Sequence, residues 1–193
     1  MPLRRPEPSK ISLKRSKKSP RCESGAFLLS FKPLADDRSR VLILGTMPGP
    51  VALKKREYYG FSGNHFWPIM FRLFGERPHA DFRKKKALLR ENRIALWDVI
   101  GACRRTGASD SSIRDVVPND IPGLIRRRKS IRTIFLNGKT AERLYRRHFG
   151  ELIHIPAYAL PSTSPAHASM SFEKKLKAWE AIKPFLANRN PWC

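Results

Sequence analysis

Short apolar runs alternate with helical segments from about residue 25 onward, and this alternation allows few folds. Strands are predicted where a short apolar run is flanked by turn-forming residues, at 41–44, 94–100, 131–136 and 153–160. Helices are predicted where apolar residues recur at helical spacing, at 66–74, 81–92, 121–129, 139–149 and 172–186. Such alternation produces a parallel sheet covered on both faces. The expected fold is therefore α/β, a three-layer α/β/α sandwich with a central four-stranded parallel sheet.

The charge balance of the chain points to a polyanionic partner. Lys and Arg total 39 against 16 Asp and Glu, which gives a formal net charge of +23. Such a positive field attracts DNA or RNA, and release of counterions from the nucleic acid supplies much of the affinity. Charge of this kind indicates a nucleic-acid partner but identifies no chemistry, because many small basic proteins bind nucleic acid only incidentally.

The first part of the chain differs in composition from the rest. Residues 1–24 are rich in Lys, Arg, Ser and Pro and have too few apolar residues to pack, so we expect a disordered basic arm. The arm would hold DNA electrostatically; a solvated leader without a specific role and a transit peptide are the alternatives. Residues 25–193 are expected to form one domain.

Cysteine content and hydropathy restrict the cofactors and the compartment. The three cysteines, Cys22, Cys103 and Cys193, are far apart and form no CxxC pair, so no zinc site or iron–sulfur cluster is expected. No apolar run has the length of a membrane span, and no signal peptide is recognisable. We expect a soluble monomer, located in the cytoplasm with the nucleoid and not in a membrane.

Chemically specific segments follow each predicted strand. They are GTMPG (45–49), Asp98 with the loop after it, Asn137-Gly138, and PSTSPAHA (161–168). Because ligands of open parallel sheets bind beyond the carboxyl ends of the strands, these segments are expected to form one site. No Walker loop, HExxH motif or GxSxG elbow occurs, and the five histidines show no metal-ligand spacing.

Several side chains in or near these segments have both a structural and a functional interpretation. Asn64 in GNHFW could be a helix cap, or its amide could hold a water or a base edge. Tyr58, Tyr59 and Phe61 could stack on a base extruded from the helix or complete the core. Asn137 could read a base edge or form a turn with Gly138. The loop 161–168, with its hydroxyls and His167, could grip phosphates or be inert.

Taken in order, five segments resemble the uracil-DNA glycosylase superfamily, and most closely its hypoxanthine-DNA (deoxyinosine) glycosylase branch. The segments are VLILGTMPG, YYGFSGNHFWPI, IALWDVIGAC, IRTIFLNGKTAERLY and LPSTSPAHA. GNHFW and the FNGK-like sequence also occur in the related mismatch-specific thymine/uracil glycosylases. The resemblance implies a monofunctional enzyme that hydrolyses the N-glycosidic bond of deaminated bases in DNA without a metal or cofactor. Double-stranded DNA is the expected substrate, and action on single-stranded DNA is left open.

The resemblance also assigns roles to individual residues. Asn64 matches the catalytic asparagine of the hypoxanthine branch, and we assign it to positioning water or the departing base because a neutral amide is no general base. Contacts with the base are implied for Gly45, Thr46, Met47, Tyr59, Phe66 and Asn137. Contacts with the DNA backbone are implied for Ser162, Ser164 and His167.

Two departures from the wider family bear on the substrate. Met47 stands where the mismatch-specific branch has an asparagine, and His167 follows Ser164-Pro165 instead of preceding the serine. Met47 moves the catalytic role to Asn64, and both departures argue against efficient uracil removal. The order among hypoxanthine, uracil, xanthine and mismatched thymine stays open, because it depends on how the residues around Met47 pack. The two departures also leave open a non-catalytic nucleic-acid-binding protein on the same scaffold, whereas a nucleotide hydrolase would fit the fold but not the charge.

Overall fold

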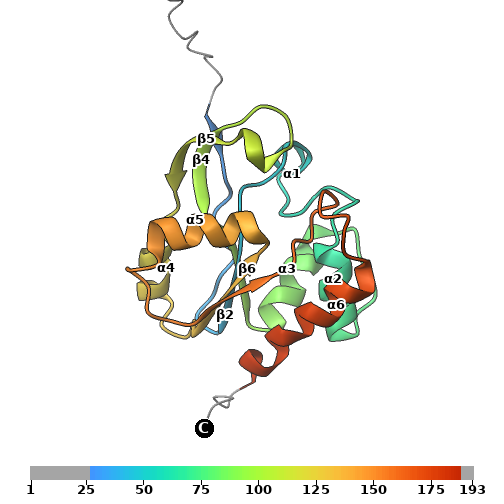
Figure 1. Cartoon of the computed structure of the whole chain (residues 1–193). Coiled ribbons are helices and arrows are strands. Elements are labelled where there is room, and N and C mark those ends of the chain that lie inside the picture. Colours follow the sequence, from blue (N-terminus) through green and yellow to red (C-terminus); the bar gives the residue numbers. More distant parts are fainter. Residues whose placement is uncertain (1–26, 188–193) are drawn as a thin grey trace, which may run out of the picture.

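A computed structural model describes residues 27–187, which fold around a central parallel sheet (Figure 1). Its four strands are β2 (Val41–Gly45), β3 (Ile94–Asp98), β6 (Thr133–Asn137) and β7 (Ala157–Leu160), in the order β3-β2-β6-β7. The first three are buried along their whole length, as expected of parallel strands covered on both faces. The expected four-stranded parallel sheet is confirmed.

Helices cover the two faces of this sheet. In Figure 1, α4 (Ile121–Arg127) and α5 (Lys139–Phe149) lie on one side of the strands, and α2 (Phe66–Phe74), α3 (Phe82–Glu91) and α6 (Phe172–Trp179) lie on the other. Side chains cap two of these helices: that of Asp120 accepts a hydrogen bond from the Gly123 N–H, and that of Ser171 accepts one from the Lys174 N–H. The predicted three-layer α/β/α sandwich is therefore confirmed.

A second, antiparallel sheet was not predicted from the sequence. It contains β1 (Leu28–Leu29), β4 (Ile100–Arg104) and β5 (Arg114–Pro118), in the order β1-β4-β5. The single strand predicted over 94–100 was wrong, because β3 ends at Asp98 and the chain then bends into β4. The bend is held by hydrogen bonds from the Val99 N–H to the Gly45 carbonyl oxygen, at 2.9 Å, and from the Ile100 N–H to that of Thr46, at 3.0 Å.

Smaller differences concern the ends of elements and short helices. The strand predicted over 153–160 begins only at Ala157, after Pro156. The helix predicted over 172–186 changes at Glu180 into the 3-10 helix η2 (Glu180–Leu186), which contains Pro184. Two short helices, α1 (Pro50–Lys55) and η1 (Asp110–Ser112), follow strand-end loops and have too few residues to show a periodic pattern. The predicted basic arm, residues 1–24, lies outside the described residues.

No helix within residues 27–187 is both long enough and apolar enough to cross a membrane.

The cap of α4 gives a first test of the fold. Asp120→Ala removes the acceptor for the Gly123 N–H, and we expect the free energy of unfolding to fall by about 1 kcal/mol, the usual cost of a lost N-cap. Asp120→Asn keeps a capping oxygen and should cost only a few tenths of a kcal/mol. Urea denaturation of both variants measures this difference, and equal losses would contradict the assigned cap.

Candidate active site

The carboxyl ends of three neighbouring strands bring polar groups close together. Gly45 at the end of β2 lies in register with Asp98 at the end of β3, and Asn137 ends β6 on the other side of β2. A Cβ atom on Gly45 would lie 2.5 Å from Asp98 Oδ1 and 2.9 Å from the hydroxyl oxygen of Tyr59. Only glycine allows this approach, so Gly45 opens the space in which a carboxyl and a phenol meet.

Asn137 is the centre of a hydrogen-bond network. Its Nδ2 donates to the Tyr59 hydroxyl and to Thr163 Oγ1, both at 2.9 Å, and its Oδ1 accepts from the Thr163 N–H, also at 2.9 Å. The side chain of Asn137 is 8% exposed. The amide therefore ties the loop of Tyr59 and the loop 161–168 to the end of the sheet.

The same network reaches Asn64 through one further bond. The Thr163 carbonyl oxygen accepts a hydrogen bond from the His65 N–H at 2.9 Å, and His65 is the neighbour of Asn64. Thr163 thus bonds both to Asn137 and to the backbone next to Asn64. The two segments that carry the asparagines, far apart in the sequence, converge at the carboxyl edge of the sheet.

The Asn64 side chain is fixed at the start of α2 and leaves part of its hydrogen-bonding capacity unused. Its Oδ1 accepts a hydrogen bond from the Phe66 N–H at 2.9 Å, which fixes the side chain at the start of α2. The side chain is half-buried, and its NH₂ group has no acceptor among residues 27–187. A carbonyl oxygen has two lone pairs, so Asn64 Oδ1 can accept one more hydrogen bond. Asn64 thus offers one acceptor site and an unused NH₂ donor at the carboxyl edge of the sheet.

The loop 45–49 offers backbone donors. The N–H groups of Thr46, Met47 and Gly49 donate to no acceptor within the described part of the chain, although Thr46 is 9% and Met47 7% exposed. Buried N–H groups without an acceptor are rare in folded proteins because they are costly. An oxygen or nitrogen acceptor of a ligand, or water, would satisfy them.

The aromatic residues of the preceding loop differ in position. Tyr58 is buried, and its hydroxyl donates to backbone carbonyl oxygens of Phe31 and Lys32, so it belongs to the core. Tyr59 is half-buried and stacks on Phe66, with ring centroids 4.0 Å apart. Phe66 is 0% exposed and supports Tyr59 from behind, so in this structure its ring is not open to a base. Direct contact between Phe66 and a base stays a prediction.

Helix α6 holds the loop 161–168 in place, which the sequence did not indicate. Lys175 is 1% exposed, and its Nζ donates to the Ser164 carbonyl oxygen at 3.3 Å. Trp179 Nε1 donates to the Pro161 carbonyl oxygen at 3.0 Å. Burial lowers the pKa of Lys175. A lysine in a basic helix is expected on the surface, so the sequence does not indicate that Lys175 is buried and holds the loop.

The three residues predicted to contact DNA phosphates lie on this clamped loop. Ser162 is half-buried, and a Cβ atom on Gly138 would lie 2.8 Å from Ser162 Cβ, so the loop packs against the start of α5. Ser164 and His167 are also partly exposed, and the His167 N–H donates to the Ser164 carbonyl oxygen at 3.1 Å. The loop is therefore a compact turn at the carboxyl edge of the sheet.

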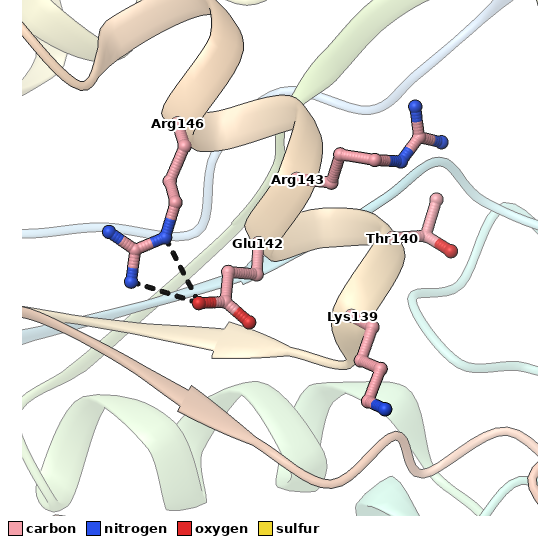
Figure 2. A pocket seen from close by; sticks show the side chains of 5 residues that line it. All are labelled: Lys139, Thr140, Glu142, Arg143 and Arg146. Atoms are coloured by element: carbon pink, nitrogen blue, oxygen red, sulfur yellow. Dashed lines mark hydrogen bonds and ion pairs between the residues drawn. The ribbon is translucent and has the colours of Figure 1, made fainter.

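A basic depression lies beside this loop on the outer surface of α5 (Figure 2). It is lined by Lys139, Thr140, Glu142, Arg143 and Arg146. Glu142 pairs with Arg146 at 2.9 Å, whereas Lys139 and Arg143, one helical turn apart, make no ion pair within residues 27–187. These two cations extend the positive surface away from the loop.

Asp98 is a buried carboxyl inside the site. It is 3% exposed, and Ser30 donates a hydrogen bond to its Oδ2 at 2.9 Å. Burial raises the pKa of Asp98 to about 7; the Ser30 bond and the charge of Arg105 oppose this rise, and the charge of Asp110 adds to it. Burial, and then the charge of Asp98, also raise the pKa of Tyr59, which keeps its hydroxyl protonated.

No group of three or more His, Cys, Asp or Glu side chains within residues 27–187 is arranged to hold a metal ion. Cys103, the one cysteine in this range, is buried and forms no disulfide bond within it.

Comparisons with known proteins agree on one family. The sequence pattern of the uracil DNA glycosylase superfamily matches residues 32–183. A protein of Methanosarcina acetivorans named hypoxanthine DNA glycosylase is 35% identical over 156 residues, which are 79% of this chain and 95% of that protein. A Methanosarcina barkeri protein of the same name is 34% identical over 110 residues, 56% of this chain and 70% of its own length.

A solved structure shows the same fold. The solution NMR structure of a Methanosarcina acetivorans protein assigned to the uracil DNA glycosylases superimposes with a TM-score of 0.71 at 34% identity. The match covers 83% of this chain and 99% of that chain.

The raised pKa of Asp98 predicts a pH-dependent stability. The unfolded chain loses this proton near pH 4, whereas the folded protein keeps it up to about pH 7. The free energy of unfolding should therefore fall as the pH rises from 4 to 7, and Asp98 contributes about 4 kcal/mol at most to this fall. Above pH 7 the contribution of Asp98 should no longer change.

Asp98→Asn removes that titration while leaving an oxygen to accept the Ser30 hydrogen bond. Urea denaturation measures the free energy of unfolding at pH 5 and pH 8. Between these pH values it should fall less for Asp98→Asn than for the wild-type protein. The comparison between the two proteins cancels the titration of other groups. An identical loss in both would show that Asp98 is ionised in the folded protein at pH 5.

Proposed function

Because the chain belongs to the uracil DNA glycosylase superfamily, we propose that it is a monofunctional DNA glycosylase that removes hypoxanthine, and less efficiently uracil or xanthine, from DNA. Its relatives from two Methanosarcina species carry the name hypoxanthine DNA glycosylase. Asn64 and Asn137 match active-site asparagines of the family, whereas Met47 stands where the mismatch-specific branch has an asparagine. The reaction breaks the bond between the base and the sugar and needs no cofactor.

The single observation that carries this proposal is the set of unused donors at the carboxyl edge of the sheet. The N–H groups of Thr46, Met47 and Gly49 and the NH₂ group of Asn64 have no acceptor among residues 27–187. A departing base carries negative charge on its oxygen and nitrogen atoms. Preorganised donors stabilise such developing charge, which is often the largest contribution to catalysis.

Asn64 acts through its fixed amide. As the N-glycosidic bond breaks, the bonding electrons leave with the base, and the sugar becomes an oxocarbenium-like cation. Oxygen of a water molecule then bonds to the sugar carbon and releases a proton to solvent. One lone pair of Asn64 Oδ1 is occupied by the Phe66 N–H, so the other is free to hold this water, and the NH₂ group can donate to the base.

Asn137 and Tyr59 form the wall of the site. Both hydrogen-bonding groups of Asn137 are engaged with Tyr59 and Thr163. A contact between Asn137 and the base requires one of these bonds to be exchanged. The network supports a role in which Asn137 sets the width of the cavity by fixing Tyr59. When the hydrogen bond to Tyr59 breaks, the Asn137 amide becomes free to bond to the edge of the base.

DNA would lie across the carboxyl edge of the sheet. Ser162, Ser164 and His167 would contact phosphates next to the flipped nucleotide, and Lys139 and Arg143 would extend this contact along the duplex. Flipping a base costs a few kcal/mol, which phosphate contacts help to offset. We propose a monomer that acts on double-stranded and also single-stranded DNA in the cytoplasm, at the nucleoid.

The catalytic role of Asn64 gives a direct test. Asn64→Ala should lower the single-turnover rate of base release by at least about a hundredfold, because the fixed amide is lost, while DNA affinity changes less than about threefold. Inosine-containing duplex, followed by alkaline cleavage, measures release; fluorescence anisotropy measures binding.

The matched control is Asn92→Ala, which removes an asparagine that bonds to the Leu88 carbonyl oxygen at the far end of α3. Asn92→Ala should release the base at the original rate. Full release by Asn64→Ala would refute the catalytic assignment. Binding without strand cleavage by the original protein would instead favour a non-catalytic DNA-binding protein.

Substrate preference gives a second test. Met47 cannot offer the amide that mismatch-specific relatives use, so duplexes that differ only in the central base should rank hypoxanthine first, with uracil released at least about tenfold more slowly. Single-turnover rates on hypoxanthine, xanthine, uracil and mismatched thymine measure the order. Uracil released as fast as hypoxanthine would contradict it.

A further inference from the structure

A second basic surface lies at the amino edge of the sheet, opposite the catalytic loops. An arginine immediately precedes each of three adjacent strands: Arg93 before β3, Arg40 before β2 and Arg132 before β6. The strands are in register, with Val41 paired to both Ile94 and Thr133. Neighbouring strands lie about 4.8 Å apart, so the backbone positions of the three arginines form a row.

Hydrogen bonds fix this row. The Arg40 N–H donates to the Arg93 carbonyl oxygen at 2.7 Å, and the Arg132 N–H donates to the Arg40 carbonyl oxygen at 2.8 Å. Arg40 and Arg93 line a surface depression together with Asp37, Arg38 and Ser130. We call the four arginines 38, 40, 93 and 132 the amino-edge cluster.

The balance of charge at this edge is positive. Two acidic residues lie beside the cluster, and both are paired: Asp37 accepts a hydrogen bond from Arg128 at 2.8 Å, and Asp36 lies 4.0 Å from Arg38. Arg38, Arg40, Arg128 and Arg132 therefore outnumber these two carboxylates. Phosphate oxygens would match this positive charge.

The amino-edge cluster is too far from the active site to bind the same DNA segment. Arg40 and Thr46 are six residues apart along β2, about 20 Å at the usual rise of a strand, and they lie at opposite ends of it. In Figure 1 the amino ends of the strands lie at the bottom of the molecule, whereas the loops of the active site lie above. A duplex held at the carboxyl edge leaves the cluster facing away from it.

We propose that the amino-edge cluster binds the phosphates of a second DNA segment, so that the protein moves from one duplex to another without first becoming free. The proposal rests on the proposed function only in taking DNA as the ligand. Contacts of this kind depend on charge and not on sequence, and they suit an enzyme that must search long stretches of undamaged DNA.

The experiment measures how fast the protein leaves a labelled duplex as unlabelled duplex is added. Simple dissociation is independent of the competitor concentration, whereas direct transfer makes the apparent rate rise in proportion to it. We expect this rise for the full chain. The variant R38Q/R40Q/R132Q should lose most of it, while its single-turnover release of hypoxanthine at saturating protein stays within about twofold. Arg93 is kept because its φ of 57° makes the local backbone sensitive to substitution.

The matched control removes the same charge elsewhere. K84Q/K174Q/K177Q changes three exposed lysines of α3 and α6 and should keep the dependence on competitor. The proposal is overturned if the original protein shows no dependence, if R38Q/R40Q/R132Q keeps it, or if the control loses it equally. Failure to release any base would count against the proposed function, whereas loss of transfer alone concerns only the cluster.

Discussion

The site depends on the hydrogen bonds that the Asn137 side chain makes at the end of β6. One amide joins Tyr59, Thr163 and the central sheet, and Thr163 passes the connection to the backbone beside Asn64. Parallel strands place their carboxyl ends at one edge, but they do not position the loops that follow. The buried amide does this, and its low exposure strengthens each bond.

Much of the fold could be predicted because it follows from local patterns. Strands such as 41–45 are short apolar runs, and helices such as 139–149 show strong apolar periodicity, so both were found close to their observed ends. The antiparallel sheet was missed because its middle strand, β4, continues directly from β3 after one residue. Val99 turns the chain through hydrogen bonds to β2, and such long-range bonds leave no trace in the sequence nearby.

The candidate site was predicted only in part, for a similar reason. The strand-end segments could be found because the rule for parallel sheets states where they meet. Thr163 and Lys175 could not: a threonine in a Ser-Pro loop and a lysine in a basic helix look like solvated residues, and their roles arise from burial after folding. The role of Phe66 could not be predicted either, because its ring supports that of Tyr59, a residue that is not its neighbour in the sequence.

The clamped loop 161–168 has a consequence for how damage is distinguished. Three of its carbonyl oxygens are held, two by Lys175 and Trp179 of α6 and one by the His65 N–H. Under the proposed DNA contact, a loop held in this way would lose little conformational entropy on binding and would yield little to fit the duplex. The duplex would have to supply the deformation itself. Weakly stacked or mispaired nucleotides deform most easily, so the mechanical softness of a lesion would become part of its recognition before any atom of the base is read.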